Sequence, residues 1–200
     1  MKVETAVKVR SRVMIPLDKG QEAEFVTFDG LASGKEHFAV VFGTPDVDNP
    51  VVRMHSECIT GDVFGSMRCD CGAQLHQSMD MMQSVGGILL YLRQEGRGIG
   101  LVAKLDAYKL QHEQGLDTYA ANEALSLPAD ARNYECAAQM LGALNVRRIR
   151  LLTNNPDKVA QIQSFGIAVT ERLNSGTFLT KFNRSYLTAK AEITSHLLRI

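Results

Sequence analysis

The chain has 200 residues, 45% of them apolar and 22% charged, which is the composition of a globular protein long enough to bury a core. It carries 22 basic and 22 acidic residues, and this balance argues against the broad basic surface of a nucleic-acid-binding protein. No apolar run approaches the roughly 20 residues that span a bilayer, and no secretory signal is visible. We therefore expect a cytoplasmic protein without a nucleic-acid or membrane partner.

The first third of the chain is predicted to form β-strands. Segments 6–17, 24–28, 37–43 and 51–55 are short, rich in Val, Phe and Ile, and separated by Gly, Pro, Asp and Asn. Their spacing indicates antiparallel pairing.

The remainder alternates between helices and strands. Helices are predicted at 73–85, 100–115, 129–146 and 155–165, with a last one at 186–198 in the tail. Strands are predicted at 87–92, 147–153 and 167–173. The predicted fold is α/β (mixed α+β): antiparallel N-terminal strands run into an α/β part around a mixed sheet, in one domain spanning 1–200.

Three of the four cysteines cluster with the spacing C-x10-C-x-C at Cys58, Cys69 and Cys71. Structural zinc sites usually have four protein ligands, whereas catalytic sites have three and leave one position open for water. The cluster thus favours a catalytic zinc. The alternatives are a structural zinc completed by His55, or three unrelated buried thiols. The fourth cysteine, Cys136, lies in an apolar helix and is interpreted as a core residue.

Two further segments have the form of anion sites. RQEGRGIG (93–100) follows a strand and opens a helix, where backbone N–H groups and the helix dipole can hold an anion. LLTNNPDK (151–158) repeats that arrangement, with Pro156 suited to the first helical turn. Each also has a plain interpretation, a glycine-rich turn or an ordinary cap. On local evidence Asp130 is likewise an N-cap, Arg132 a solvated charge and Tyr108 a packing residue.

Together these segments resemble the GTP cyclohydrolase II family over roughly residues 20–172. The resemblance rests on RMHSECITGD (53–62), RCDCGAQ (68–74), RQEGRGIGL (93–101), D-x-R (130–132) and LLTNNP-x-K (151–158). It implies hydrolysis of GTP at C8 of the guanine ring, with release of formate and pyrophosphate to give 2,5-diamino-6-hydroxy-4-(5-phosphoribosylamino)pyrimidine at the start of riboflavin synthesis. It also implies a homodimer, one catalytic Zn²⁺ per chain, and Mg²⁺ bound with the triphosphate.

The resemblance also implies roles for individual residues. The three cysteines would bind the zinc, Asp130 would be the proton acceptor, Arg132 would attack or stabilise the transferring phosphoryl group, and Tyr108 would assist hydrolysis at C8. Glu95 or Gln74 would read the guanine edge. The implied GTP-binding residues are Arg53, Met54, His55, Ser56, Glu57, Gln74, Glu95, Gly96, Arg97, Thr118, Thr153 and Lys158.

The sequence departs from the family pattern mainly in its tail, 173–200. Leu173, Asn174 and Ser175 replace the usual V-P-L, and Ser195 replaces a glycine. An alternative is therefore a divergent paralogue that stops at the formylamino-pyrimidine or uses another purine nucleotide. A remote alternative is a non-catalytic zinc module that binds nucleotide.

Overall fold

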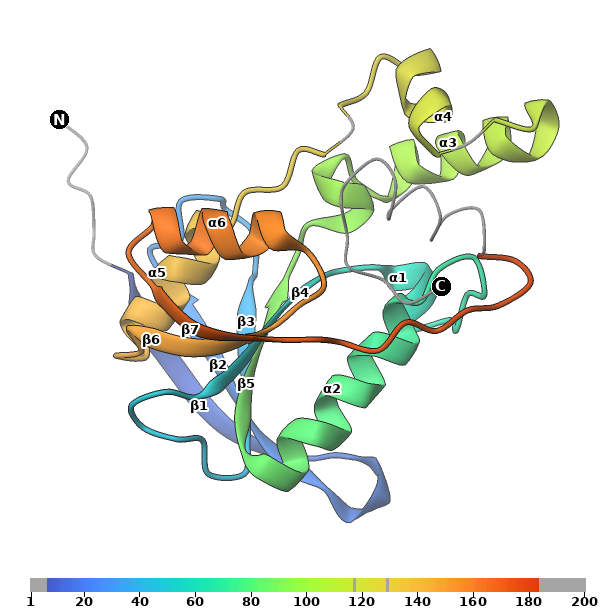
Figure 1. Ribbon diagram of the computed structural model, residues 1–200. Coiled ribbons are helices and arrows are strands. Elements are labelled where there is room, and N and C mark those ends of the chain that lie inside the picture. Colours follow the sequence, from blue (N-terminus) through green and yellow to red (C-terminus); the bar gives the residue numbers. More distant parts are fainter. Residues whose placement is uncertain (1–6, 117, 129, 184–200) are drawn as a thin grey trace, which may run out of the picture.

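The computed structural model of this protein describes residues 7–116, 118–128 and 130–183. Its strands form a seven-stranded mixed sheet in the order β1-β2-β3-β5-β4-β6-β7 (Figure 1). The strands are β1 Lys8–Pro16, β2 Glu22–Asp29, β3 Phe38–Phe42, β4 Val51–Ser56, β5 Gly87–Leu92, β6 Arg148–Leu152 and β7 Ala168–Leu173. Neighbours from β1 through β3 to β5 are antiparallel, and those from β5 through β4 and β6 to β7 are parallel. The predicted mixed α/β class is confirmed.

Strand β4 pairs differently from the sequence prediction, which had it antiparallel with the other N-terminal strands. It lies between β5 and β6 and is parallel to both. The reason is the connection: the chain passes through two helices before it returns as β5, and a helical crossover joins parallel strands. Residues 51–55 are all buried, as expected for a central strand covered on both faces.

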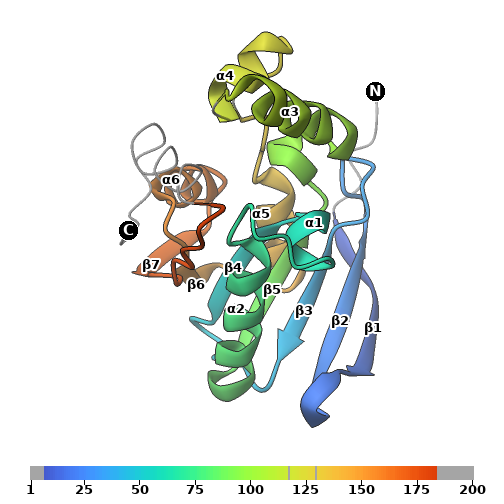
Figure 2. The same ribbon diagram turned by 90° about the vertical axis from the view of Figure 1, so that its right-hand side faces the viewer.

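Helices cover both faces of the sheet (Figures 1 and 2). On one face, Leu75 and Met82 of α2 pack with Phe42 of β3 and Leu89 of β5. The other face is covered by α5 and α6, whose Met140, Leu141 and Ile162 pack with Leu90 and Leu151. The helices are α1 Ile59–Asp62, α2 Cys71–Val85, α3 Leu101–Gln114, α4 Thr118–Ala124, α5 Glu135–Ala143 and α6 Pro156–Ser164, with 3-10 turns η1 Asp18–Gly20 and η2 Glu95–Gly98.

Helices α3 and α4 extend past the end of the sheet at which β5 finishes (Figures 1 and 2). Gly115 ends α3 as predicted: its φ is +69°, and its N–H donates to the carbonyl oxygen of Gln111 over 3.1 Å. Helix α4 and the four-residue α1 were not predicted. Within the described part of the chain, no helix has both the length and the apolar character needed to cross a membrane.

The third predicted helix, 129–146, was placed too early. Helix α5 begins at Glu135, and residues 130–134 precede it without helical structure. Asp130 is therefore not the N-cap; the side chain of Asn133 accepts the Glu135 N–H instead, over 2.6 Å. The error has a physical origin, because Asp commonly caps helices, whereas α5 begins after Tyr134, which makes no side-chain capping bond. The predicted tail helix, 186–198, lies outside the described residues.

Candidate active site

One pocket opens at the carboxyl ends of β4, β5 and β6. The connection after β4 passes over one face of the sheet and the helix that precedes β6 lies on the other, so a crevice forms where they diverge. The predicted site residues that line it are Arg53, Met54, His55, Ser56, Glu57, Cys58, Cys69, Cys71, Gln74, Glu95, Gly96, Arg97, Tyr108, Asp130, Arg132, Thr153 and Lys158. Thr118 begins α4, but its side chain lies outside the described part of the structure.

The three clustered cysteines come together where the chain leaves β4 and enters α2. Their sulfur atoms lie within 4.8 Å of one another, and Cys58 and Cys69 are separated by 3.6 Å. Two sulfur ligands of a tetrahedral zinc, each about 2.3 Å from the metal, are about 3.8 Å apart. A Cβ atom on Gly61 would lie 2.9 Å from the Cys69 sulfur and 3.2 Å from that of Cys58, so glycine there leaves the sulfurs their space. The donor set and its spacing fit a zinc ion.

The three clustered thiols differ in how readily each loses its proton. The pKa of Cys58 lies far below its ordinary value, chiefly because the Cys69 and Cys71 side chains hydrogen-bond to its sulfur. The same contacts raise the pKa of Cys69 to about 11 and that of Cys71 well above the ordinary value. Binding a divalent cation would displace the remaining protons from such a cluster.

His55 is committed to an internal network. Its Nε2 lies 3.0 Å from both carboxylate oxygens of Asp62, which also accepts the Cys58 N–H over 3.0 Å and the Tyr91 hydroxyl over 2.8 Å. Burial lowers the pKa of His55, so the neutral ring donates from Nε2. This arrangement argues against His55 as a fourth metal ligand, and it fixes the start of α1 beside the thiols.

Glu95 and Gln74, expected to read guanine, both have internal partners. The Glu95 carboxylate accepts the Ile59 N–H over 2.7 Å, its neighbour Gly96 N–H over 2.7 Å, and the Lys104 ammonium over 2.8 Å. The Gln74 amide accepts from Arg53 and donates to Asp70 and to the Gly176 carbonyl. In this structure, both side chains hold parts of the pocket wall together.

The RQEGRGIG segment forms the turn η2 with an unusual backbone. Gly96 and Arg97 both have left-handed torsions, with φ of +60° and +58°. Gly98, at φ +93°, packs against the D-x-R segment: a Cβ there would lie 3.1 Å from the Ala131 carbonyl carbon and oxygen. The Ala131 N–H donates to the Arg97 carbonyl over 3.0 Å. The two segments are thus joined through their backbones.

Asp130 and Arg132 form an ion pair inside the pocket. The Arg132 Nε–H donates to both Asp130 oxygens, over 2.9 and 3.1 Å, and the backbone N–H of Arg132 also donates to that carboxylate. Burial alone would raise the pKa of Asp130, but the bonds from Arg132 outweigh it and the pKa is lowered. Asp130 is therefore an anion that orients the guanidinium.

Lys158 approaches the pocket from α6. Its ammonium donates to the Met54 carbonyl over 2.8 Å and lies 5.3 Å from the centre of the Tyr134 ring. The helix begins at Pro156 and is capped by Asn155, whose side chain accepts the Asp157 N–H over 2.9 Å. The predicted cap at LLTNNPDK is thus present, and Lys158 in the first turn after it lines the pocket.

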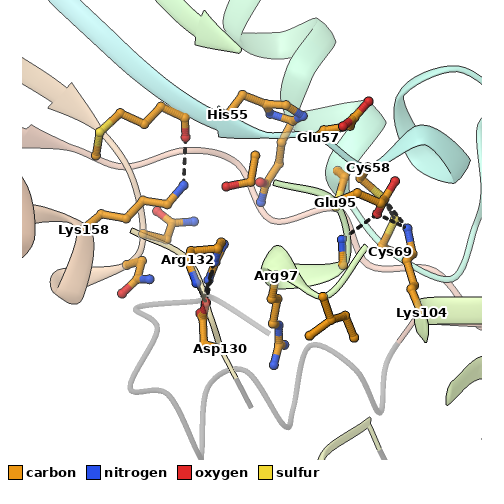
Figure 3. Close-up of a pocket in the computed structure, with 18 of the residues that line it drawn as sticks. His55, Glu57, Cys58, Cys69, Glu95, Arg97, Lys104, Asp130, Arg132 and Lys158 are labelled. Atoms are coloured by element: carbon orange, nitrogen blue, oxygen red, sulfur yellow. Dashed lines mark hydrogen bonds and ion pairs between the residues drawn. The ribbon is translucent and has the colours of Figure 1, made fainter. Parts of the chain in front are cut away.

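The pocket has two chemically different sides (Figure 3). The thiolate side consists of Cys58, Cys69, Cys71, Glu95 and Lys104. The cation side, opposite to it, consists of Asp130, Arg132 and Lys158. Arg97 lies between the two. A ligand that carries an electrophilic group at one end and several negative charges at the other would match this arrangement.

Sequence reasoning missed several lining residues, among them Lys104, Gln111, Asn122, Asn154 and Ser175. Lys104, Ala107, Tyr108 and Gln111 share one face of α3, at spacings of three and four residues, and this face turns toward the pocket. No local pattern predicted this face, because α3 exposes Leu101, Val102 and Leu105 and buries Lys104 and Ala107. Only Tyr108 was taken from that face.

Ser175 belongs to the altered segment that follows β7. Its N–H donates to the Asn154 side chain over 3.0 Å and its carbonyl accepts from it over 2.7 Å. Both contacts use the Ser175 backbone, so they tolerate a change of side chain. This explains why the loss of the V-P-L pattern leaves the pocket wall in place.

Comparison with known proteins yields consistent results. A family model described as GTP cyclohydrolase II matches residues 8–174. A protein named GTP cyclohydrolase-2 from Psychromonas ingrahamii is 49% identical over 196 residues, covering 96% of this chain and 98% of its own length. A second of that name, from Vibrio vulnificus, is 49% identical over 197 residues, covering 96% and 99%. The riboflavin biosynthesis protein RibBA of Bacillus mycoides is 48% identical over 98% of this chain, which corresponds to 50% of that longer protein.

Proposed function

This chain belongs to the GTP cyclohydrolase II family of hydrolases, and on that premise we propose that it opens the imidazole ring of GTP at C8. The products are formate, pyrophosphate and 2,5-diamino-6-hydroxy-4-(5-phosphoribosylamino)pyrimidine, which begins riboflavin biosynthesis. The reaction takes place in the cytoplasm, and the protein acts as a homodimer on a small-molecule substrate, without nucleic acid or membrane. The observation that supports this most directly is the pairing of a three-thiol cluster with a cation-lined side in one pocket.

Cys58, Cys69 and Cys71 hold the zinc. When bound, the ion supplies a Lewis acid and lowers the pKa of water toward neutrality, and the C8 hydrolysis requires this chemistry. The protein residues around it set the geometry. Asp62 fixes the backbone of Cys58 and the ring of His55, and Glu95 fixes the Ile59 N–H one residue further along α1.

Tyr108 assists at the thiolate side. Its ring lies between two cations, 4.8 Å from the guanidinium carbon of Arg68 and 5.7 Å from the Lys104 ammonium. Such contacts hold an aromatic ring in one orientation. The tyrosine hydroxyl then stands near the reacting carbon of the purine and orients water and the departing formyl group.

The cation side binds the triphosphate. Arg132, Lys158 and Arg97 neutralise the charge that develops as pyrophosphate leaves, and Mg²⁺ bound with the triphosphate would supply further positive charge. A guanidinium remains protonated and is a poor nucleophile, so Arg132 acts by electrostatic stabilisation. Asp130 keeps the guanidinium in position and is the acceptor for a proton released during the step. The remaining wall residues, including Ser56, Glu57 and Thr153, enclose the nucleotide. The family resemblance adds Thr118 to the residues that bind it.

The test is an incubation of zinc-loaded protein with GTP and Mg²⁺, with mass analysis of the pyrimidine and parallel assays of formate and pyrophosphate. All three products together support the proposal. Pyrophosphate with a retained formyl group would identify a divergent paralogue that stops early. Turnover of another purine nucleotide in place of GTP would make that nucleotide the substrate. Zinc binding without turnover of any purine nucleotide would identify a non-catalytic nucleotide-binding module.

A further inference from the structure

A buried lysine on α3 touches the thiol cluster. The Lys104 ammonium donates to the Cys58 sulfur over 3.2 Å, to the Thr60 hydroxyl over 3.0 Å and to the Glu95 carboxylate over 2.8 Å (Figure 3). Lys104 is 8% exposed. An ammonium has three protons to donate, and the three contacts account for all of them.

Burying this charge demands a reason. An ammonium removed from water loses several kcal/mol of solvation, which only partners at close range can offset. Glu95 supplies the counter-charge, and it is itself fixed by the N–H groups of Ile59 and Gly96. Lys104 is thus held in one position at the edge of the cluster, in direct contact with a ligand atom.

The charge balance of the cluster supplies that reason. Three thiolates around a divalent cation leave an excess of one negative charge, and electron donation from sulfur weakens the cation as a Lewis acid. An N–H donor on a ligand sulfur withdraws part of that density, so a bound cation would remain a stronger Lewis acid, and outer partners of metal ligands also fix the orientation of those ligands. Arg53 is buried too, but its guanidinium donates to Gln74, whereas the Lys104 ammonium donates directly to a ligand sulfur.

We propose that Lys104, fixed by Glu95, is a positioning residue for the metal: it holds the Cys58 sulfur in place, and so sets how tightly the cluster holds zinc, and it offsets the excess negative charge of the three thiolates. This inference rests on the proposed function only in taking the cysteines as the zinc site. It assigns Glu95 to the support of that site in addition to any contact with GTP.

The first test measures zinc affinity without substrate, by competition with a chelator of known affinity. Loss of an outer partner of a metal ligand typically costs about 10- to 100-fold in affinity, and this loss is expected for Lys104→Met. Lys109→Met is the matched control, since Lys109 lies on the same helix with its side chain 70% exposed and should leave the affinity unchanged. Equal affinity of wild type and Lys104→Met would overturn the inference while leaving the zinc site and the proposed function intact.

A second variant separates the charge effect from damage to the fold. Lys104→Met leaves the Glu95 carboxylate buried without its cation, which is itself destabilising. The double variant Lys104→Met/Glu95→Gln removes both charges. If the lost contact to sulfur is the cause, the double variant stays weak in zinc; recovery of wild-type affinity would mean that the stranded carboxylate was responsible and would overturn the inference.

A spectroscopic readout tests the contact to sulfur directly. In the cobalt(II)-substituted protein, the sulfur-to-metal charge-transfer band should move to longer wavelength in Lys104→Met, since a sulfur that loses its N–H donor gives up an electron more readily. Lys104→Arg retains a cationic donor and should lie between the two. An unchanged band in Lys104→Met would show that the Lys104 ammonium does not act on the ligand sulfur and would contradict the inference.

Discussion

The two sides of the pocket are built in different ways. On the thiolate side, Lys104 and Glu95 have side chains 9% exposed and contact each other. Lys104 also donates to the Cys58 sulfur, and Glu95 accepts the Ile59 N–H. On the cation side, Asp130 is 36% and Arg132 14% exposed, and they contact each other in a segment without regular structure. The first is a closed site suited to holding an ion in fixed geometry. The second is an open site suited to a flexible, charged substrate group. The experiments below test this contrast.

The largest effect is expected on the thiolate side. Cys58→Ser, Cys69→Ser and Cys71→Ser should each lose zinc and reduce formate release by at least about 1,000-fold, because the metal supplies several kcal/mol of transition-state stabilisation. Metal analysis and a formate assay check this. Cys136→Ala is the control, since Cys136 is buried in α5 and does not line the pocket. Full activity in a zinc-free variant would rule out the catalytic metal.

The next effect belongs to the cation side. Arg132→Ala should slow pyrophosphate release by about 100- to 1,000-fold, the usual cost of losing one group that stabilises developing charge, with a much smaller change in GTP affinity. Arg10→Ala, 70% exposed on β1, is the matched control. Equal losses in binding and in turnover would make Arg132 a binding residue only.

A third prediction concerns His37, which contacts the chain just before the η2 turn that carries Glu95. His37 is 3% exposed, and its Nδ1 accepts the Arg93 N–H just before the η2 turn, over 2.9 Å. Burial, with smaller contributions from Lys35 and Arg93, lowers the pKa of His37 from 6.5 to about 4. Between these values the unfolded chain binds a proton that the folded one does not, so stability is present above pH 6.5 and is lost as the pH falls toward 4.

The contribution of His37 is at most about 3 kcal/mol. In His37→Asn, whose amide oxygen can accept the same N–H, the free energy of unfolding should fall less steeply between pH 6.5 and 4 than in the wild type. Urea unfolding at several pH values measures the difference. Parallel curves for the two proteins would mean that His37 does not titrate in this range.

The smallest effect is expected at the base of the cation side. Asn155→Ala removes the cap of α6 and should cost about 1 kcal/mol of stability. Asn155→Asp retains an acceptor there and should keep the stability, but it places a negative charge at the pocket wall. GTP should then bind several-fold more weakly, as measured by calorimetry. Unchanged GTP binding by Asn155→Asp would place the triphosphate elsewhere.

Prediction from sequence succeeded where the signal was local. Neighbouring residues determine the strand patterns, the end of α3 at Gly115 and the start of α6 at Asn155–Pro156. The structure contains all three. The pairing of β4 was wrong because it depends on which strands the later chain brings beside it. The predicted start of α5 was wrong because the D-x-R segment uses the Asp130 carboxylate for an ion pair, and the helix begins only at Glu135.

For the site, the family resemblance named most of the residues that line the pocket, but not what each one contacts. C-x10-C-x-C predicts three sulfurs in proximity, and the structure brings them together. That Lys104 contacts Cys58 depends on how α3 packs beside the start of α1, and no local pattern predicts a contact between residues 46 positions apart. The engagement of Glu95 and Gln74 within the wall was missed for the same reason.

The backbone contact between Gly98 and Ala131 bears on how members of the family can be recombined. Since the turn after β5 and the D-x-R segment touch without side chains between them and share a hydrogen bond from Ala131 to Arg97, neither can be lengthened or rotated alone. In a chimera of two relatives, the two segments have to be taken from the same parent. The two segments form a single packing unit even though some 30 residues lie between them in the chain.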